Sequence, residues 1–155
     1  MTKVALSESA AIINSVRFYS HSATGNVRLA IYAETGALLW ESPEIANSVN
    51  AGWIRVPIAN GTPSSLTSLS AGNYYLAFQT DTDTAVASYV AGASGTGEFS
   101  VVPYGAFPSN FTTVYNRVSS ADNYVMSAVY NKNITVTQSG GSTNITEGGG
   151  NDSYT

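Results

Sequence analysis

The chain has 155 residues, of which 43% are hydrophobic and only 10% are charged, and its formal net charge is −4. This length and apolar content suit one domain with its own core, while soluble proteins usually carry about 25% charged residues. Without cysteine the chain has no disulfide, thiolate metal site or cysteine nucleophile.

The six basic residues form no continuous run along the sequence, and phosphate-backbone binding needs them clustered. They are Lys3, Arg17, Arg28, Arg55, Arg117 and Lys132. We therefore expect no nucleic-acid partner.

The first residues, MTKVALSESAAIINSV, lack the basic and apolar regions of a signal peptide, and no run approaches the ~18 apolar residues of a membrane span. We expect no membrane insertion, and either a removed export signal or none.

Alternating apolar residues predict short strands along the chain, and no stretch keeps a helical period for three turns. Strands are expected over residues 12–19, 26–33, 37–41, 53–58, 66–69, 74–79, 85–90, 98–102, 124–130 and 134–137. The clearest has Tyr74, Leu76 and Phe78 on one face, and Pro57 indicates a strand end or a sheet edge. Strand and turn signals recur about every ten residues, which predicts an all-β, antiparallel two-sheet β-sandwich.

The composition changes at Gln138, after which the chain is rich in Gly, Ser, Thr and Asn and ends GGSTNITEGGGNDSYT. Such a segment has too little apolar surface to fold alone. We therefore divide the chain into a sandwich domain, residues 1–137, and a C-terminal tail, residues 138–155. The tail is either a flexible end or an arm that packs on a neighbouring subunit.

The sequence offers little for catalysis. The only histidine is His21, which lies between two serines at a strand end, and a surface role is expected for it. No nucleophile-elbow motif accompanies it, and a catalytic carboxylate pair would have to be assembled in space. We predict that the protein is not an enzyme.

Asp81 and Asp83 alternate with two threonines in a predicted loop, so their oxygens are suited to a hard cation such as Ca²⁺. A complete site needs six or more oxygen ligands, and the acid-rich loop of an EF-hand is missing. A hairpin turn is the favoured interpretation, with calcium binding as the alternative. No other cofactor is expected.

Aromatic residues are abundant, with ten Tyr, five Phe and two Trp. Flat rings stack on sugar rings, but they also fill cores and subunit contacts. We expect Trp40 and Trp53 in the core. The residues proposed for sugar stacking surround a Pro- and Gly-containing loop and are Tyr104, Phe107, Phe111 and Tyr115.

The runs GNVRLAIYAETGALLWES, AGWIRVPI and AGNYYLAFQ, with YGAFPS and a closing YVMSAVY, carry a family resemblance. Over roughly residues 10–132 the chain resembles the jelly-roll-type sandwich modules of uncharacterised bacterial and archaeal surface proteins and of phage virion proteins. The resemblance implies a sandwich and no reaction, because these runs mark strands rather than an active site.

Two functions remain open. The first is an assembly protein, either a virion component such as a head decoration or fibre module, or a subunit of a surface filament or layer. It would bind copies of itself or other subunits through strand edges, aromatic patches and terminal arms. The alternative is a carbohydrate-binding or adhesin module, with or without calcium, in a secreted protein. The expected location is the virion, the cell surface or the extracellular space.

Overall fold

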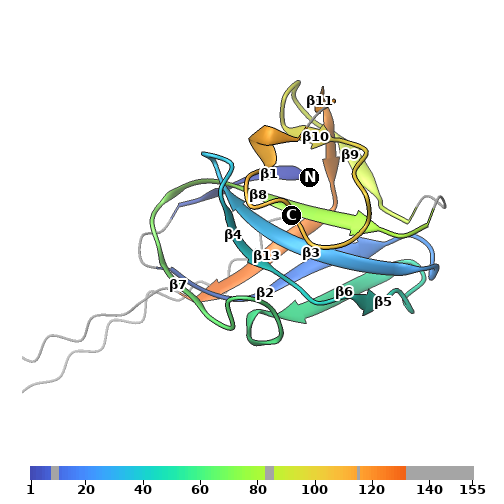
Figure 1. The fold of residues 1–155 in the computed structure, drawn as a ribbon, viewed down its shortest axis with the longest axis horizontal. Helices are drawn as coiled ribbons and strands as arrows, with labels where there is room; N and C mark the ends of the chain where they lie inside the picture. The colour runs from blue at the N-terminus through green and yellow to red at the C-terminus, as the bar shows by residue number, and fades with distance from the viewer. Residues whose placement is uncertain (8–10, 83–85, 115, 132–155) are drawn as a thin grey trace, which may run out of the picture.

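The computed structural model describes residues 1–7, 11–82, 86–114 and 116–131 (Figure 1). Within these ranges the chain is all-β, and the only helices are two single 3-10 turns, η1 (Ile58–Asn60) and η2 (Phe111–Thr113). The predicted strand at 134–137, the boundary at 137 and the tail 138–155 lie outside the described residues.

Thirteen strands are formed within the described ranges. They are β1 (Thr2–Leu6), β2 (Ala11–Ser20), β3 (Asn26–Ala33), β4 (Leu38–Glu41), β5 (Ile45–Ala46), β6 (Gly52–Pro57), β7 (Leu66–Leu69), β8 (Gly72–Thr80), β9 (Tyr89–Ala91), β10 (Gly97–Phe99), β11 (Val118–Ser120), β12 (Asp122–Tyr124) and β13 (Met126–Asn131).

The strands form two main sheets. The seven-stranded sheet has the order β11-β10-β1-β8-β3-β4, with β5 beside β3, and the four-stranded sheet has the order β13-β2-β6, with β7 beside β2. A third, two-stranded sheet joins β9 and β12. Every strand pair in the three sheets is antiparallel. The predicted antiparallel β-sandwich is confirmed, whereas its jelly-roll connectivity stays a prediction.

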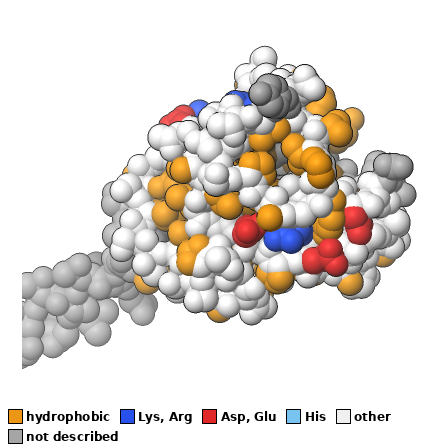
Figure 2. All heavy atoms as spheres, in the orientation of Figure 1, with side chains coloured by type: hydrophobic (Ala, Val, Ile, Leu, Met, Phe, Trp, Pro, Cys, Tyr) orange, Lys and Arg blue, Asp and Glu red, His pale blue; other side chains and the backbone are white. Residues whose placement is uncertain are grey.

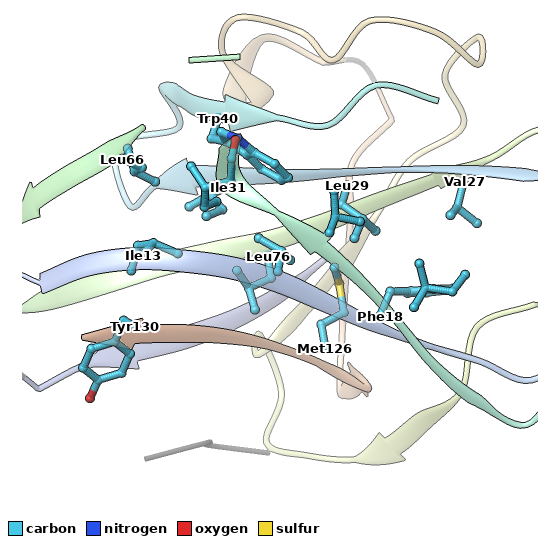
Figure 3. Packing of buried hydrophobic residues seen from close by; sticks show 14 of the residues in the cluster. Ile13, Phe18, Val27, Leu29, Ile31, Trp40, Leu66, Leu76, Met126 and Tyr130 are labelled. Atoms are coloured by element: carbon cyan, nitrogen blue, oxygen red, sulfur yellow. The ribbon is translucent and has the colours of Figure 1, made fainter. Parts of the chain in front are cut away.

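The main core lies between the two larger sheets (Figure 3). Leu29 of β3 points toward Met126 of β13, Ile31 of β3 lies near Trp40, and Phe18 of β2 belongs to the same core; these side chains are all buried. They occupy alternate positions because successive strand residues point to opposite faces. Trp40 closes one side of this core with no exposed surface, as predicted.

A second buried cluster covers the outer face of the seven-stranded sheet. Tyr32 of β3 and Tyr75 of β8 point outward from the main core, and Phe107 and Phe111 pack over them from the segment 100–114. The loop that follows β10 therefore acts as a lid on the sheet. This lid gives the sandwich a partial third layer, which the strand pattern alone did not predict.

Trp53 corrects one prediction, because it is 39% exposed rather than part of the core. Its neighbours Ile54 and Val56 face inward and are buried, so the period of two places Trp53 on the outer face of β6. Pro57 ends β6, the edge strand of its sheet, as predicted.

The strands differ from expectation at the N-terminus and between residues 85 and 102. The sequence did not predict β1, which lies between β8 and β10. The predicted strand at 98–102 ends earlier, since β10 stops at Phe99 and the chain then leaves the sheet to form the lid. β9 is shorter than the predicted strand at 85–90 and is shifted toward the C-terminus.

Candidate functional site

A pocket with a volume of about 290 Å³ lies under the lid segment, beside the ends of β8 and β10. Seven of the 18 residues that line it are aromatic and come from the sheet, the lid and β12. These are Tyr32, Phe78, Phe99, Tyr104, Phe107, Phe111 and Tyr124. A volume of this size holds a small molecule or one side chain of a partner, because a cavity of about 150 Å³ already admits benzene.

Hydrogen bonds fix the lid over the sheet. The Tyr32 hydroxyl donates to the Pro108 carbonyl at 2.9 Å, and the Gly105 backbone N–H donates to Oε1 of Gln79 at 3.1 Å. The Phe107 N–H donates to Oε2 of Glu41, also at 3.1 Å. These three bonds join strand side chains to lid backbone, so the pocket is formed before any ligand binds.

Three of the four residues predicted for sugar stacking meet in this pocket. Tyr104 is half-buried, whereas Phe107 and Phe111 are only 8% and 5% exposed. The Phe111 ring makes edge contacts with Tyr32 and Tyr75, with centroids 5.2 and 4.9 Å apart. The two phenylalanines therefore contribute to the fold as well as to the pocket wall, and sugar stacking stays a prediction. Tyr115, the fourth residue, lies outside the described residues.

An ion pair forms one side of the pocket. Arg117 donates from Nη2 to Oε2 of Glu98 at 2.7 Å, and its guanidinium carbon lies 4.9 Å from the centroid of the Phe111 ring. Since the two charges neutralise each other, this wall presents little net charge to a ligand. Burial, followed by the nearby Glu44 and Asp81 carboxylates, raises the pKa of Tyr104 to about 12.

Asp81 lies in a turn beside the start of β3. Its Oδ1 accepts from the Asn26 backbone N–H at 2.6 Å, and its Oδ2 accepts from Nδ2 of Asn26 at 2.7 Å. Hydrogen bonds from the backbone and then the side chain of Asn26 lower the pKa of this carboxyl. The neighbouring Gly25 has φ +67° and leaves no room for a Cβ beside Oδ1 of Asp81. Asp81 thus fixes a turn.

Calcium binding at this turn stays a prediction. Asp83, the second predicted ligand, lies outside the described residues. Within the part of the chain that the structure describes, no three His, Cys, Asp or Glu side chains come together as a metal-binding group.

His21 is exposed at the end of β2, where its backbone N–H donates to the Val86 carbonyl at 2.7 Å. Its position agrees with the expected surface residue, and the absence of enzymatic activity stays a prediction.

Exposed apolar side chains gather at the end of the molecule that carries β9 to β11 (Figure 2). Across the described residues six large hydrophobic side chains are exposed, and five of them lie between residues 89 and 118. We call these five the apolar end: Tyr89, Val90, Phe99, Val101 and Val118. This surface could not be predicted from the sequence, because the strands that carry most of it are three residues long and show no clear alternation.

Comparison of this chain with protein-family models, curated proteins and solved structures finds no match. Over the described ranges, no helix has the length and apolar character needed to cross a bilayer.

Proposed function

We propose that this domain is a non-enzymatic assembly subunit that associates through the apolar end. The observation that carries the proposal is the exposure of Val101, at 94%, beside Phe99 at 47% and Val118 at 46%. Phe99 and Val118 are directly opposite each other on β10 and β11, so their side chains share one face. Neighbouring exposed apolar side chains of this kind are typical of protein contacts in soluble domains.

Strand edges at the same end support the proposal. β11 is the last strand of the seven-stranded sheet, so one side of its backbone has no partner strand among the described residues. An unpaired edge can add a strand from another subunit, where backbone hydrogen bonds supply affinity. Apolar side chains beside an open edge therefore suit attachment to a copy of this chain or to another subunit.

The composition is the basis for proposing a virion or cell-surface assembly as the setting. A chain rich in Ser, Thr, Asn and Gly with only 10% charged residues is suited to packing against neighbours. The resemblance to surface and phage virion modules points the same way.

Sedimentation-velocity centrifugation over a wide concentration range tests the assembly proposal. We expect the purified protein to form oligomers, and Val101→Asp to shift it to monomer because a buried unpaired carboxylate opposes association. Thr67→Asp, an exposed substitution on β7, is the matched control and should leave the oligomer intact. A protein that stays monomeric at every concentration would contradict the proposal.

The pocket favours a second candidate, a carbohydrate-binding or adhesin module. Tyr104 lines the pocket with part of its ring accessible, and Gln79 offers an amide beside it. A glycan array run with calcium and with chelator tests this function and the role of the ion together. Saturable binding that Tyr104→Ala abolishes would support it, whereas unchanged binding in this variant would exclude the pocket.

A further inference from the structure

Two arginines stand opposite each other on the outer face of the four-stranded sheet. Arg17 of β2 and Arg55 of β6 are paired in the antiparallel register, so their side chains leave the same side of the sheet. Their neighbours Phe18 and Ile54 are buried in the main core, which places both arginines on the outer face.

These arginines differ from the other cations that the structure describes. Lys3 pairs with Glu34 at 2.7 Å, Arg28 with Glu41 at 3.1 Å and Arg117 with Glu98 at 2.7 Å. Throughout the described ranges, no carboxylate lies within ion-pair distance of Arg17 or Arg55. Like charges placed directly opposite each other destabilise a sheet, so the fold gains nothing from this pairing.

A buried serine positions one of the two guanidinium groups. Nε of Arg55 donates to Oγ of Ser15 at 3.0 Å, and Ser15 has no exposed surface. This bond uses the inner nitrogen and leaves the two terminal nitrogens for another acceptor. Arg55 is therefore oriented over the sheet with its outer donors directed away from Ser15.

An aromatic pair adjoins the arginine pair. Tyr19 and Trp53 are opposite each other two residues further along the same strands, a step of about 6.7 Å. Their rings make a T-shaped contact with centroids 5.4 Å apart, and Trp53 is 39% exposed. Because a T-shaped contact occupies an edge or a single face of the indole, Trp53 keeps a face for stacking.

We propose that these four residues, the arginine–tryptophan face, form a binding site for an acidic saccharide. One pyranose ring stacks on Trp53, and its carboxylate or sulfate group reaches Arg17 and Arg55. Guanidinium groups suit this role because they bind planar and tetrahedral anions through paired hydrogen bonds. The open face offers a flat ring beside two charges, which is the arrangement that a sugar ring with an anionic substituent requires.

Isothermal titration calorimetry with oligogalacturonate tests the proposal. The methyl ester of this saccharide, which keeps the sugar rings and lacks the negative charge, is the control ligand. We expect the acid form to bind, the ester to bind about tenfold more weakly or not at all, and added salt to weaken binding of the acid. Arg17→Gln, Arg55→Gln and Trp53→Ala should each lower affinity for the acid by about tenfold. Lys3→Gln, which removes a charge elsewhere, should bind like the unmodified protein.

Thermal unfolding separates a binding role from a structural one. Arg17→Gln should leave the temperature midpoint of unfolding unchanged or raise it, because the substitution removes the repulsion between two like charges. A large fall in the midpoint would mean that the arginine maintains the fold, and that result would overturn the proposal.

Three binding results would also overturn it: no binding of oligogalacturonate, equal binding of its methyl ester, or affinity that is independent of both arginines. Equal affinity for oligoglutamate, unaffected by Trp53→Ala, would assign the face to acidic peptides instead. Val101→Asp should leave saccharide affinity unchanged, so the two proposals can fail independently.

Discussion

The side chains of Arg28 and Glu41 pair at 3.1 Å on the outer face of β3 and β4, where each is about one-fifth exposed. The same oxygen, Oε2 of Glu41, accepts the N–H of Phe107, so a single carboxylate joins the sheet to the lid over the aromatic pocket. Nε of Arg28 is buried and has no partner in the described part of the chain. The pair is therefore one of several polar links between the sheet and the lid.

Glu41→Ala should destabilise the domain by about 2 kcal/mol, because it removes two charge-assisted hydrogen bonds and leaves Arg28 unpaired in a partly buried position. Glu41→Gln keeps an acceptor for the Phe107 N–H, so it should lower the free energy of unfolding by less than Glu41→Ala does. Urea denaturation followed by circular dichroism measures both variants. Equal losses of stability in the two variants would show that Glu41 stabilises the domain through its negative charge rather than through its bond to the lid.

The lowered pKa of Asp81 predicts a loss of stability in acid. Its carboxylate is stabilised by Asn26 in the folded state, so this contribution is fully present above the ordinary value of 3.8 and is lost as the pH falls through the lower folded value. Asp81→Asn should be less stable than the unmodified protein at neutral pH, and the difference should narrow in acid. Denaturation midpoints at several pH values measure this, with Asp122→Asn as the control. A difference that is independent of pH would contradict the prediction.

The raised pKa values of two tyrosines predict a loss of stability in alkali. Burial raises the pKa of Tyr32, and it raises that of Tyr104 to about 12 from 10.0. The neutral phenol is favoured in the folded state, so stability is full below pH 10 and declines as the pH approaches 12. Absorbance titration of the phenolate should show that Tyr104→Phe removes a group titrating near 12. If the lost group instead titrates at 10, the environment assigned to Tyr104 is wrong.

The strands of the main core could be predicted because alternation alone defines them. Val27, Leu29 and Ile31 are buried as the period of two requires. The prediction for Trp53 was wrong because residue type was given more weight than phase. Ile54 and Val56 set the inward face of β6, so the residue before Ile54 points outward.

The pocket and β1 depend on contacts between distant parts of the chain, which local patterns do not contain. β1 is a five-residue strand with a lysine, and its place is set by pairing with β8. Tyr104, Phe107 and Phe111 were identified because they surround a Pro- and Gly-containing loop and lie outside the clear strand faces. Tyr32 was not identified, because the strand pattern places it on the outer face but does not show that a distant loop covers this face. Similarly, Arg17 and Arg55 lie far apart in sequence, and only the register of β2 and β6 places them together.

The two tryptophans should respond differently to the same substitution. Trp40 has no exposed surface, and its Nε1 donates to the Ile58 carbonyl at 3.0 Å. Trp40→Phe removes one of the two hydrogen bonds to that carbonyl, since the Gly61 N–H also donates to it, and opens space beside Gly61, whose backbone packs against the indole. We therefore expect a loss of about 2 kcal/mol in the free energy of unfolding. Trp53→Phe is the matched control and should change stability by less than about 0.5 kcal/mol, because its ring lies on the outer face. Urea denaturation followed by far-ultraviolet circular dichroism compares them, and similar losses would contradict the placement of Trp40 in the core and Trp53 outside it.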